Sequence, residues 1–131
     1  MAIVCLDTDI LIDAIRAEEP LSRLASISGS GACATIITIL ELYYGAFKSK
    51  NAGDVALVDL LKNDITIIDL NEEDARLAGK MMAELDKKGS RLDFRDVAIG
   101  AICINRRMTL ITRNTKHFGR LSAYGLLVAN I

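Results

Sequence analysis

Short apolar runs rich in β-branched residues alternate with amphipathic segments along the whole chain, and this alternation limits the fold more than any other feature. The apolar runs predict strands, which cover residues 2–6, 32–36, 65–70, 109–113 and 124–131. The segments between them predict helices, which cover residues 9–17, 21–27, 38–49, 53–63, 71–89 and 93–107. Strands that alternate with helices indicate an α/β fold with a mainly parallel central sheet flanked by helices.

Length and composition place this fold in one domain. A chain of 131 residues predicts a single domain over residues 1–131, and 51% apolar residues are enough for a substantial core. No apolar stretch approaches the roughly 20 residues that a membrane span needs. Asp7 and Asp9 come early, without the basic head of a signal peptide, so we expect a cytoplasmic protein that makes no membrane contact.

The cysteines argue against a zinc site. Cys5, Cys33 and Cys103 are far apart in the sequence and lie among apolar residues, and His117 is the only histidine. Zinc sites need clustered cysteine and histidine ligands. We therefore expect all three cysteines to be buried as small hydrophobic residues.

Polar residues of one kind follow the apolar runs, in or beside the first turn of a predicted helix. They are Asp7, Glu41 and Asp96, with Asn114 at a fourth such position. Because the carboxyl ends of parallel strands meet at one edge of a sheet, we expect these side chains to converge there. Carboxylates repel one another unless a cation holds them together, and hard oxygen ligands suit Mg²⁺ or Mn²⁺. The pattern therefore predicts a metal site for phosphodiester chemistry.

Each acidic position also has a purely structural interpretation. Asp7 or Asp9 can cap the first helix. The segment Thr38–Glu41 has the form of a capping box, and Asp93–Asp96 has that of an N-cap followed by an acid at the third helical position. The convergence of these helix starts at one sheet edge favours the functional interpretation, and helix amides there are expected to help keep the acids ionised.

The charge is unevenly distributed. Residues 1–86 hold 15 acids and 7 bases, whereas residues 87–120 hold 2 acids and 9 bases. A local positive field of this kind attracts a polyanion, although a solvated basic face without function has the same composition. Around the acids we expect substrate contacts from Thr8, Thr112, Arg113 and Lys116. Asp9 is a candidate helper of Asp7, and Asp13 is expected on the outer face of the first helix.

Four motifs in order resemble the PIN domain and, within it, the VapC-like toxins of toxin–antitoxin pairs. The opening matches at Leu6-Asp7-Thr8-Asp9-Ile10-Leu11-Ile12-Asp13, where the family usually has Asn in place of Asp9. The second motif runs through Glu41-Leu42 to Gly45, and the third is Asp96-Val97-Ala98-Ile99-Gly100-Ala101. The last is Thr112-Arg113-Asn114 followed by His117-Phe118. Many PIN domains have a fourth acid where this chain has Asn114.

The resemblance implies a three-layer PIN fold and a metal-dependent ribonuclease. Asp7, Glu41 and Asp96 would bind Mg²⁺ or Mn²⁺, and Asn114 would complete the catalytic set. Arg113 and Lys116 would hold the RNA backbone. The resemblance also implies a homodimer and a small VapB-like antitoxin. The aromatic cluster Tyr43, Tyr44 and Phe47 is a candidate for either such an interface or ordinary core packing.

Two other functions remain open at this point. Asp7-Thr8-Asp9 is similar to the D-x-D opening of haloacid-dehalogenase-like phosphatases, in which the first aspartate is the nucleophile. The other alternative is a catalytically weak PIN-fold module that binds RNA or a partner, for which Asn114 is the only indication.

Overall fold

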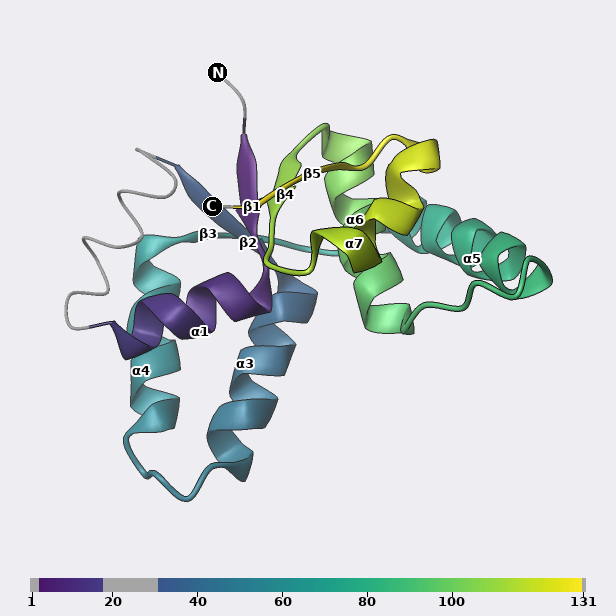
Figure 1. Ribbon diagram of the computed structural model, residues 1–131. Helices are drawn as coiled ribbons and strands as arrows, with labels where there is room; N and C mark the ends of the chain where they lie inside the picture. Colours follow the sequence, from purple (N-terminus) through teal and green to yellow (C-terminus); the bar gives the residue numbers. More distant parts are fainter. Residues whose placement is uncertain (1–2, 18–30, 131) are drawn as a thin grey trace.

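A five-stranded parallel sheet forms the centre of the protein (Figure 1). The computed structural model describes residues 3–17 and 31–130. The strands are β1 (Val4–Leu6), β2 (Ala32–Thr35), β3 (Thr66–Ile68), β4 (Thr109–Ile111) and β5 (Leu127–Ala129), in the order β3-β2-β1-β4-β5. Every neighbouring pair is parallel, as the alternation of strands and helices predicted.

The helices lie close to their expected positions. They are α1 (Thr8–Arg16), α3 (Ile36–Lys48), α4 (Asp54–Leu61), α5 (Glu72–Lys87), α6 (Phe94–Arg106) and α7 (Thr115–Phe118). Short 3₁₀ segments cover Lys62–Asp64 and Gly119–Tyr124. The sequence did not predict α7 or the second 3₁₀ segment, because such segments are too short to have a recognisable hydrophobic periodicity. The helix expected over 21–27 lies outside the described residues.

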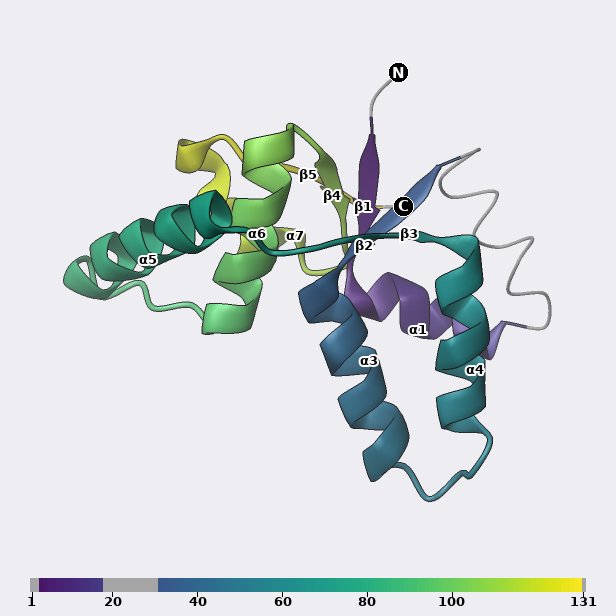
Figure 2. The ribbon, with the colours of Figure 1, turned by 180° about the vertical axis from the view of Figure 1, so that it is seen from behind.

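Side chains that alternate along the strands fill two separate cores, one on each face of the sheet. Leu6 and Ile111 pack with α1, α3 and α4, whereas Cys5 and Leu110 pack with α5 and α6. Figures 1 and 2 show these two groups of helices on either side of the strands. The three-layer α/β arrangement is therefore confirmed. Cys5 and Cys103 are buried as expected, but Cys33 is only partly buried.

A buried ion pair joins α5 to α6. The Asp74 side chain is fully buried and accepts hydrogen bonds from Arg106 Nη1 (2.9 Å), Asn105 Nδ2 (2.8 Å) and the backbone N–H that belongs to Asn71. Burial raises the pKa of Asp74, but the donors from Arg106, Asn71 and Asn105 outweigh it and leave the pKa below its usual value. This network fixes the start of α5 against the end of α6.

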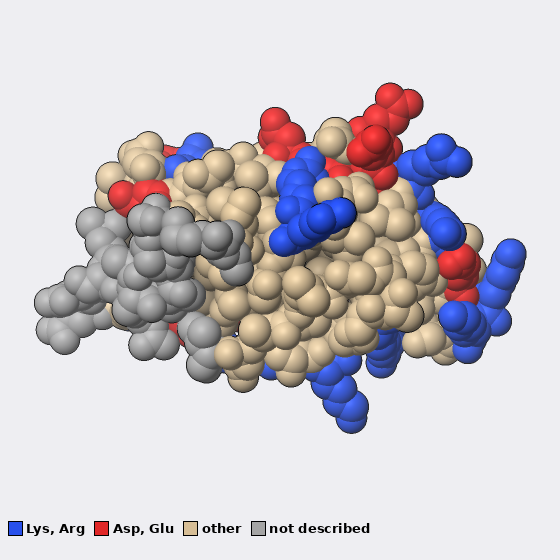
Figure 3. Space-filling model, turned by 90° about the horizontal axis from the view of Figure 1, so that it is seen from above, with Lys and Arg blue, Asp and Glu red and all other residues tan. Residues whose placement is uncertain are grey.

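The strand order places a switch point at the centre of the sheet. From β1 the chain proceeds to β2 and β3 on one side, and β4 and β5 lie on the other. Ligands of open parallel sheets bind outside the carboxyl ends of the strands at such a point. In Figure 1 this is the lower end, where α1, α3 and α7 begin. Figure 3 views the opposite end, whose surface is largely uncharged with Lys, Arg, Asp and Glu mostly toward its edges. Among the described residues, no helix is long and apolar enough to cross a membrane.

Candidate active site

Asp7 occupies the carboxyl end of β1 and caps α1. Its Oδ1 accepts the N–H of Thr8 at 2.8 Å, its Oδ2 accepts the hydroxyl of Thr112 at 2.7 Å, and the residue is only 7% exposed. Burial raises its pKa to about 6, helped by the charges of Asp9 and Asp96, while both hydrogen bonds act in the opposite direction. The expectation that helix amides keep the acids ionised is therefore only partly right, because burial has the larger effect.

Glu41 extends from α3 toward the start of α1. Thr8 donates its hydroxyl to Glu41 Oε1 at 2.8 Å. The capping-box interpretation of Thr38–Glu41 is wrong: α3 begins at Ile36, and Thr35 is its cap, accepting the N–H of Thr38 at 3.2 Å. Glu41 therefore has no capping role. Burial and the nearby charges of Asp96 and Asp93 raise its pKa, while Thr8 and Arg95 oppose the rise.

Asp96 lies in the first turn of α6, and Asp93 caps that helix as predicted. The Asp93 carboxylate accepts the N–H of Arg95 at 2.9 Å, which leaves Asp96 free of a capping role. Asp96 Oδ2 instead lies 2.8 Å from Nε2 of His117, a residue of α7. The pKa values of Asp7 and Glu41 are both raised by the Asp96 charge, so the three acids share one region.

His117 is the residue of the last motif that contacts Asp96. Asn114 is exposed and precedes α7, its side chain does not cap that helix, and its backbone N–H donates to the Thr112 hydroxyl at 3.0 Å. His117 is held in place because the adjacent Phe118 is 1% exposed and anchors α7 in the core. The sequence did not single out His117 for this contact; its only signal was a histidine in the same motif as Asn114.

Asp9 ties the start of α1 to the loop after β4. Its Oδ2 accepts the backbone N–H of Arg113 at 3.2 Å and lies 3.5 Å from the Thr112 hydroxyl. Its Oδ1 is buried and has no hydrogen-bond partner among the described residues. A buried carboxylate oxygen without a hydrogen-bond partner destabilises the folded protein unless another group interacts with it. A bound cation would supply that interaction for the Asp9 oxygen beside Asp7.

The basic residues predicted to hold RNA differ in their availability. The Arg113 guanidinium donates to Asp13 Oδ1 at 3.2 Å, so it lies across the outer face of α1. Lys116 is exposed on α7, next to His117. Among the described arginines and lysines, only Arg95 forms an ion pair with one of the three acids, with its Nη1 3.9 Å from Glu41 Oε2.

The acids fit a divalent cation by their chemistry and their mutual repulsion. All are oxygen donors, the set that Mg²⁺ and Mn²⁺ prefer. The pKa values of Asp7 and Glu41 are raised chiefly by burial and, to a smaller extent, by the charge of Asp96. A cation would relieve both that repulsion and the unpaired Asp9 oxygen. They are not a closed ligand set: within residues 3–17 and 31–130, no three His, Cys, Asp or Glu side chains surround one position.

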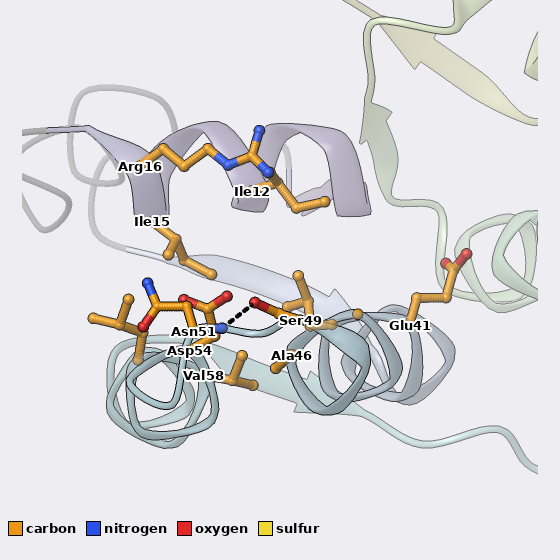
Figure 4. A pocket seen from close by; sticks show the side chains of 12 residues that line it. Ile12, Ile15, Arg16, Glu41, Ala46, Ser49, Asn51, Asp54 and Val58 are labelled. Atoms are coloured by element: carbon orange, nitrogen blue, oxygen red, sulfur yellow. Dashed lines mark hydrogen bonds between the residues drawn. The ribbon is translucent and has the colours of Figure 1, made fainter.

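A cavity of about 580 Å³ adjoins the acids between α1, α3 and α4. Figure 4 shows Glu41 at one end, apart from the other side chains, and Arg16 and Asp54 toward the other end. Apolar side chains line much of the space between; they include Ile12, Ile15, Leu42, Ala46 and Val58. The exposed side chains Leu40, Tyr44 and Phe47 lie on α3, so core packing does not account for Tyr44 and Phe47.

Sequence comparisons match the chain over most of its length. The PIN domain matches residues 4–123. Ribonuclease VapC2 of Haemophilus influenzae is 34% identical over 121 residues, which are 90% of this chain and 91% of that protein. The tRNA(fMet)-specific endonuclease VapC of Salmonella typhimurium is 29% identical over 118 residues, 88% of this chain and 89% of that protein.

Two solved toxin–antitoxin complexes contain a chain with the same fold. A chain of DNA-bound VapBC from Salmonella typhimurium matches with a TM-score of 0.86 and 27% identity, over 99% of this chain and 98% of that chain. A chain of VapBC2 from Rickettsia felis, bound to a promoter DNA fragment, matches with a TM-score of 0.82 and 28% identity over 98% of both chains. Neither comparison supports the haloacid-dehalogenase alternative.

Proposed function

Because the chain belongs to the PIN-domain family, among its VapC-like ribonucleases, we propose that it is a Mg²⁺- or Mn²⁺-dependent endoribonuclease and the toxin of a VapBC-type pair. The observation that carries the proposal is that Thr8 hydrogen-bonds both Asp7 and Glu41 at the switch point of the sheet, with Asp96 close enough to raise the pKa of each. Three carboxylates that repel one another at the carboxyl ends of strands are an arrangement suited to a cation.

In this proposal Asp7, Glu41 and Asp96 hold the cation. A divalent cation supplies charge neutralisation at the scissile phosphate and activation of the attacking water. The neighbouring side chains keep the carboxylates in place: Thr112 donates to Asp7, and Thr8 donates to Glu41. We assign Thr8 and Thr112 this orienting role ahead of direct substrate contact, because each hydroxyl proton is already committed to a carboxylate.

RNA would reach the acids across the basic segment that includes Arg113 and Lys116. Both side chains are exposed, and both follow β4 at the end of the sheet that carries the acids. Contacts of this kind act on phosphates and give affinity without base selection. Asn114 would assist from the same loop. The proposal therefore includes RNA as the polyanion that the basic segment attracts.

The cavity and the exposed face of α3 suit a protein partner. The cavity leads from Glu41 along apolar side chains, and Leu40, Tyr44 and Phe47 extend the apolar surface outside it. An apolar patch beside an acidic site fits a small VapB-like antitoxin that covers the acids, and a second copy of the chain fits the remaining helix face. The VapBC complexes that share this fold support the antitoxin as a partner.

Metal-dependent cleavage tests the proposal. We expect the purified protein to cut RNA with Mn²⁺ or Mg²⁺ and to stop when EDTA is added. Asp96→Asn should abolish cleavage and weaken Mn²⁺ binding in calorimetry. Asp93→Ala should cost about 0.5–2 kcal/mol of stability as a lost cap and should still cleave RNA, at a rate per folded molecule lowered by the release of Arg95.

Three results would contradict the proposal. Cleavage that continues in EDTA and leaves 2′,3′-cyclic phosphate ends would exclude the metal mechanism. Mn²⁺ binding without any cleavage of RNA, or no Mn²⁺ binding at all, would favour the binding module instead.

A further inference from the structure

We propose that Arg95 binds the phosphate group of the RNA that lies over Glu41 and Asp96. The inference rests on the proposed function and adds a substrate contact that the sequence motifs do not contain. It starts from one observation: Arg95 is the only arginine or lysine among the described residues that forms an ion pair with Asp7, Glu41 or Asp96.

Asp93 holds the Arg95 side chain in place. Nε and Nη2 of Arg95 donate to the two Asp93 oxygens at 3.0 and 3.1 Å, so both edges of the carboxylate are used. This bidentate contact fixes the plane of the guanidinium group. It leaves Nη1 without a hydrogen bond to any described residue, on the side of the group that faces Glu41.

The contact between Arg95 and Glu41 is too long to hold the two side chains together. The distance is 3.9 Å, and the Arg95 side chain is 44% exposed, so the pair contributes little to stability. A cation bound by Glu41 would compete for the same carboxylate. Arg95 would then present Nη1 to an anion above the acids, and a phosphate matches the donor geometry of a guanidinium group.

The other arginines that form ion pairs in the described residues pair with acids outside this group of three. Arg113 pairs with Asp13, and Arg106 pairs with the buried Asp74. Arg91 lies on the same segment as Arg95 but pairs with Asp86, and its side chain is 82% exposed. Arg91 is therefore a matched control: an arginine in an acidic pair, four residues from Arg95, without a contact to the three acids.

The test compares Arg95→Gln with Arg91→Gln. Binding of a fluorescent single-stranded RNA is measured in an Asp96→Asn background, which binds without cutting, over a range of salt concentrations. We expect Arg95→Gln to weaken binding at least fivefold and to lower the slope of log K against log salt by about 0.7, the value for one phosphate contact on a single strand. Arg91→Gln should stay within about twofold of its parent.

Cleavage and metal binding in the otherwise unchanged protein separate Arg95 from the metal ligands. We expect Arg95→Gln to lower kcat/KM for RNA at least tenfold, and Arg95→Lys to recover part of it. Mn²⁺ affinity of Arg95→Gln should equal or exceed that of the wild type, because a positive charge next to Glu41 has been removed.

The proposal is overturned if Arg95→Gln and Arg91→Gln bind RNA equally well, or if the loss in Arg95→Gln follows weaker Mn²⁺ binding. Failure of the proposed function is a different result, namely a wild-type protein that does not cleave RNA with Mn²⁺. The binding comparison in the Asp96→Asn background decides the role of Arg95 in that case as well.

Discussion

Replacing Asp7 by asparagine should make the metal-free protein more stable while it removes function. Burial raises the pKa of Asp7 from 3.8 to about 6, a shift of about two units. At about 1.4 kcal/mol per unit, ionised Asp7 costs the folded protein about 3 kcal/mol at neutral pH. Asparagine keeps the capping oxygen for the N–H of Thr8, and its amide can donate to the Thr112 hydroxyl. We therefore expect Asp7→Asn to raise the free energy of unfolding by about 2 kcal/mol and by no more than about 3 kcal/mol.

The sign of the pH dependence follows from the same shift. Between pH 3.8 and about 6 the unfolded chain releases the Asp7 proton while the folded protein retains it, so wild-type stability falls as the pH rises. Above this window the full cost is present. The advantage of Asp7→Asn should accordingly be absent near pH 3.8, grow toward pH 6 and remain constant above pH 7.

Urea unfolding in EDTA between pH 4 and 8 measures this difference. Asp64→Asn, an exposed acid far from the site in sequence, should stay within about 0.5 kcal/mol of the wild type. Mn²⁺ at about 100 times its Kd should stabilise the wild type by about 2.7 kcal/mol and leave Asp7→Asn nearly unchanged. An Asp7→Asn protein that is less stable than the wild type at pH 7, or whose advantage does not vary with pH, would refute the reasoning.

Two further substitutions test the contacts around the site. Asp74→Ala leaves Arg106 without its buried partner and should lower the free energy of unfolding, measured in urea, by about 3 kcal/mol. Glu73→Ala, a substitution at the exposed neighbouring residue, should leave the free energy of unfolding almost unchanged. Because the pKa of Asp74 is lowered in the fold, this difference should shrink in acid as Asp74 takes up a proton; a constant difference would mean that packing is responsible. His117→Ala should weaken Mn²⁺ binding about tenfold by releasing Asp96, and His117→Gln should restore part of it; tighter binding in His117→Ala would show that the imidazole competes with the metal.

The sequence predicted the sheet and the convergence of the acids, because both depend on periodicity and on the direction of parallel strands. It placed the cap of α3 three residues late, at Thr38 instead of Thr35, since both threonines are acceptable caps and only the buried strand end decides between them. The sequence pattern did not predict side-chain contacts between segments that are far apart in the chain. His117 reaches Asp96 from a helix of four residues, and Asp74 looks like any acid in the first turn of a helix until α6 packs against it.

The hydrogen bond from Thr112 to Asp7 joins residues 105 positions apart in the chain. Asp7, a proposed metal ligand, is therefore synthesised well before β4, the strand that leads to Thr112 and completes its surroundings. A nascent or prematurely terminated chain that stops before β4 therefore lacks one wall of the site, together with Thr112 and His117. The order of synthesis therefore delays assembly of the proposed site until β4 and α7 have been translated, after α1, α3 and α4 are complete.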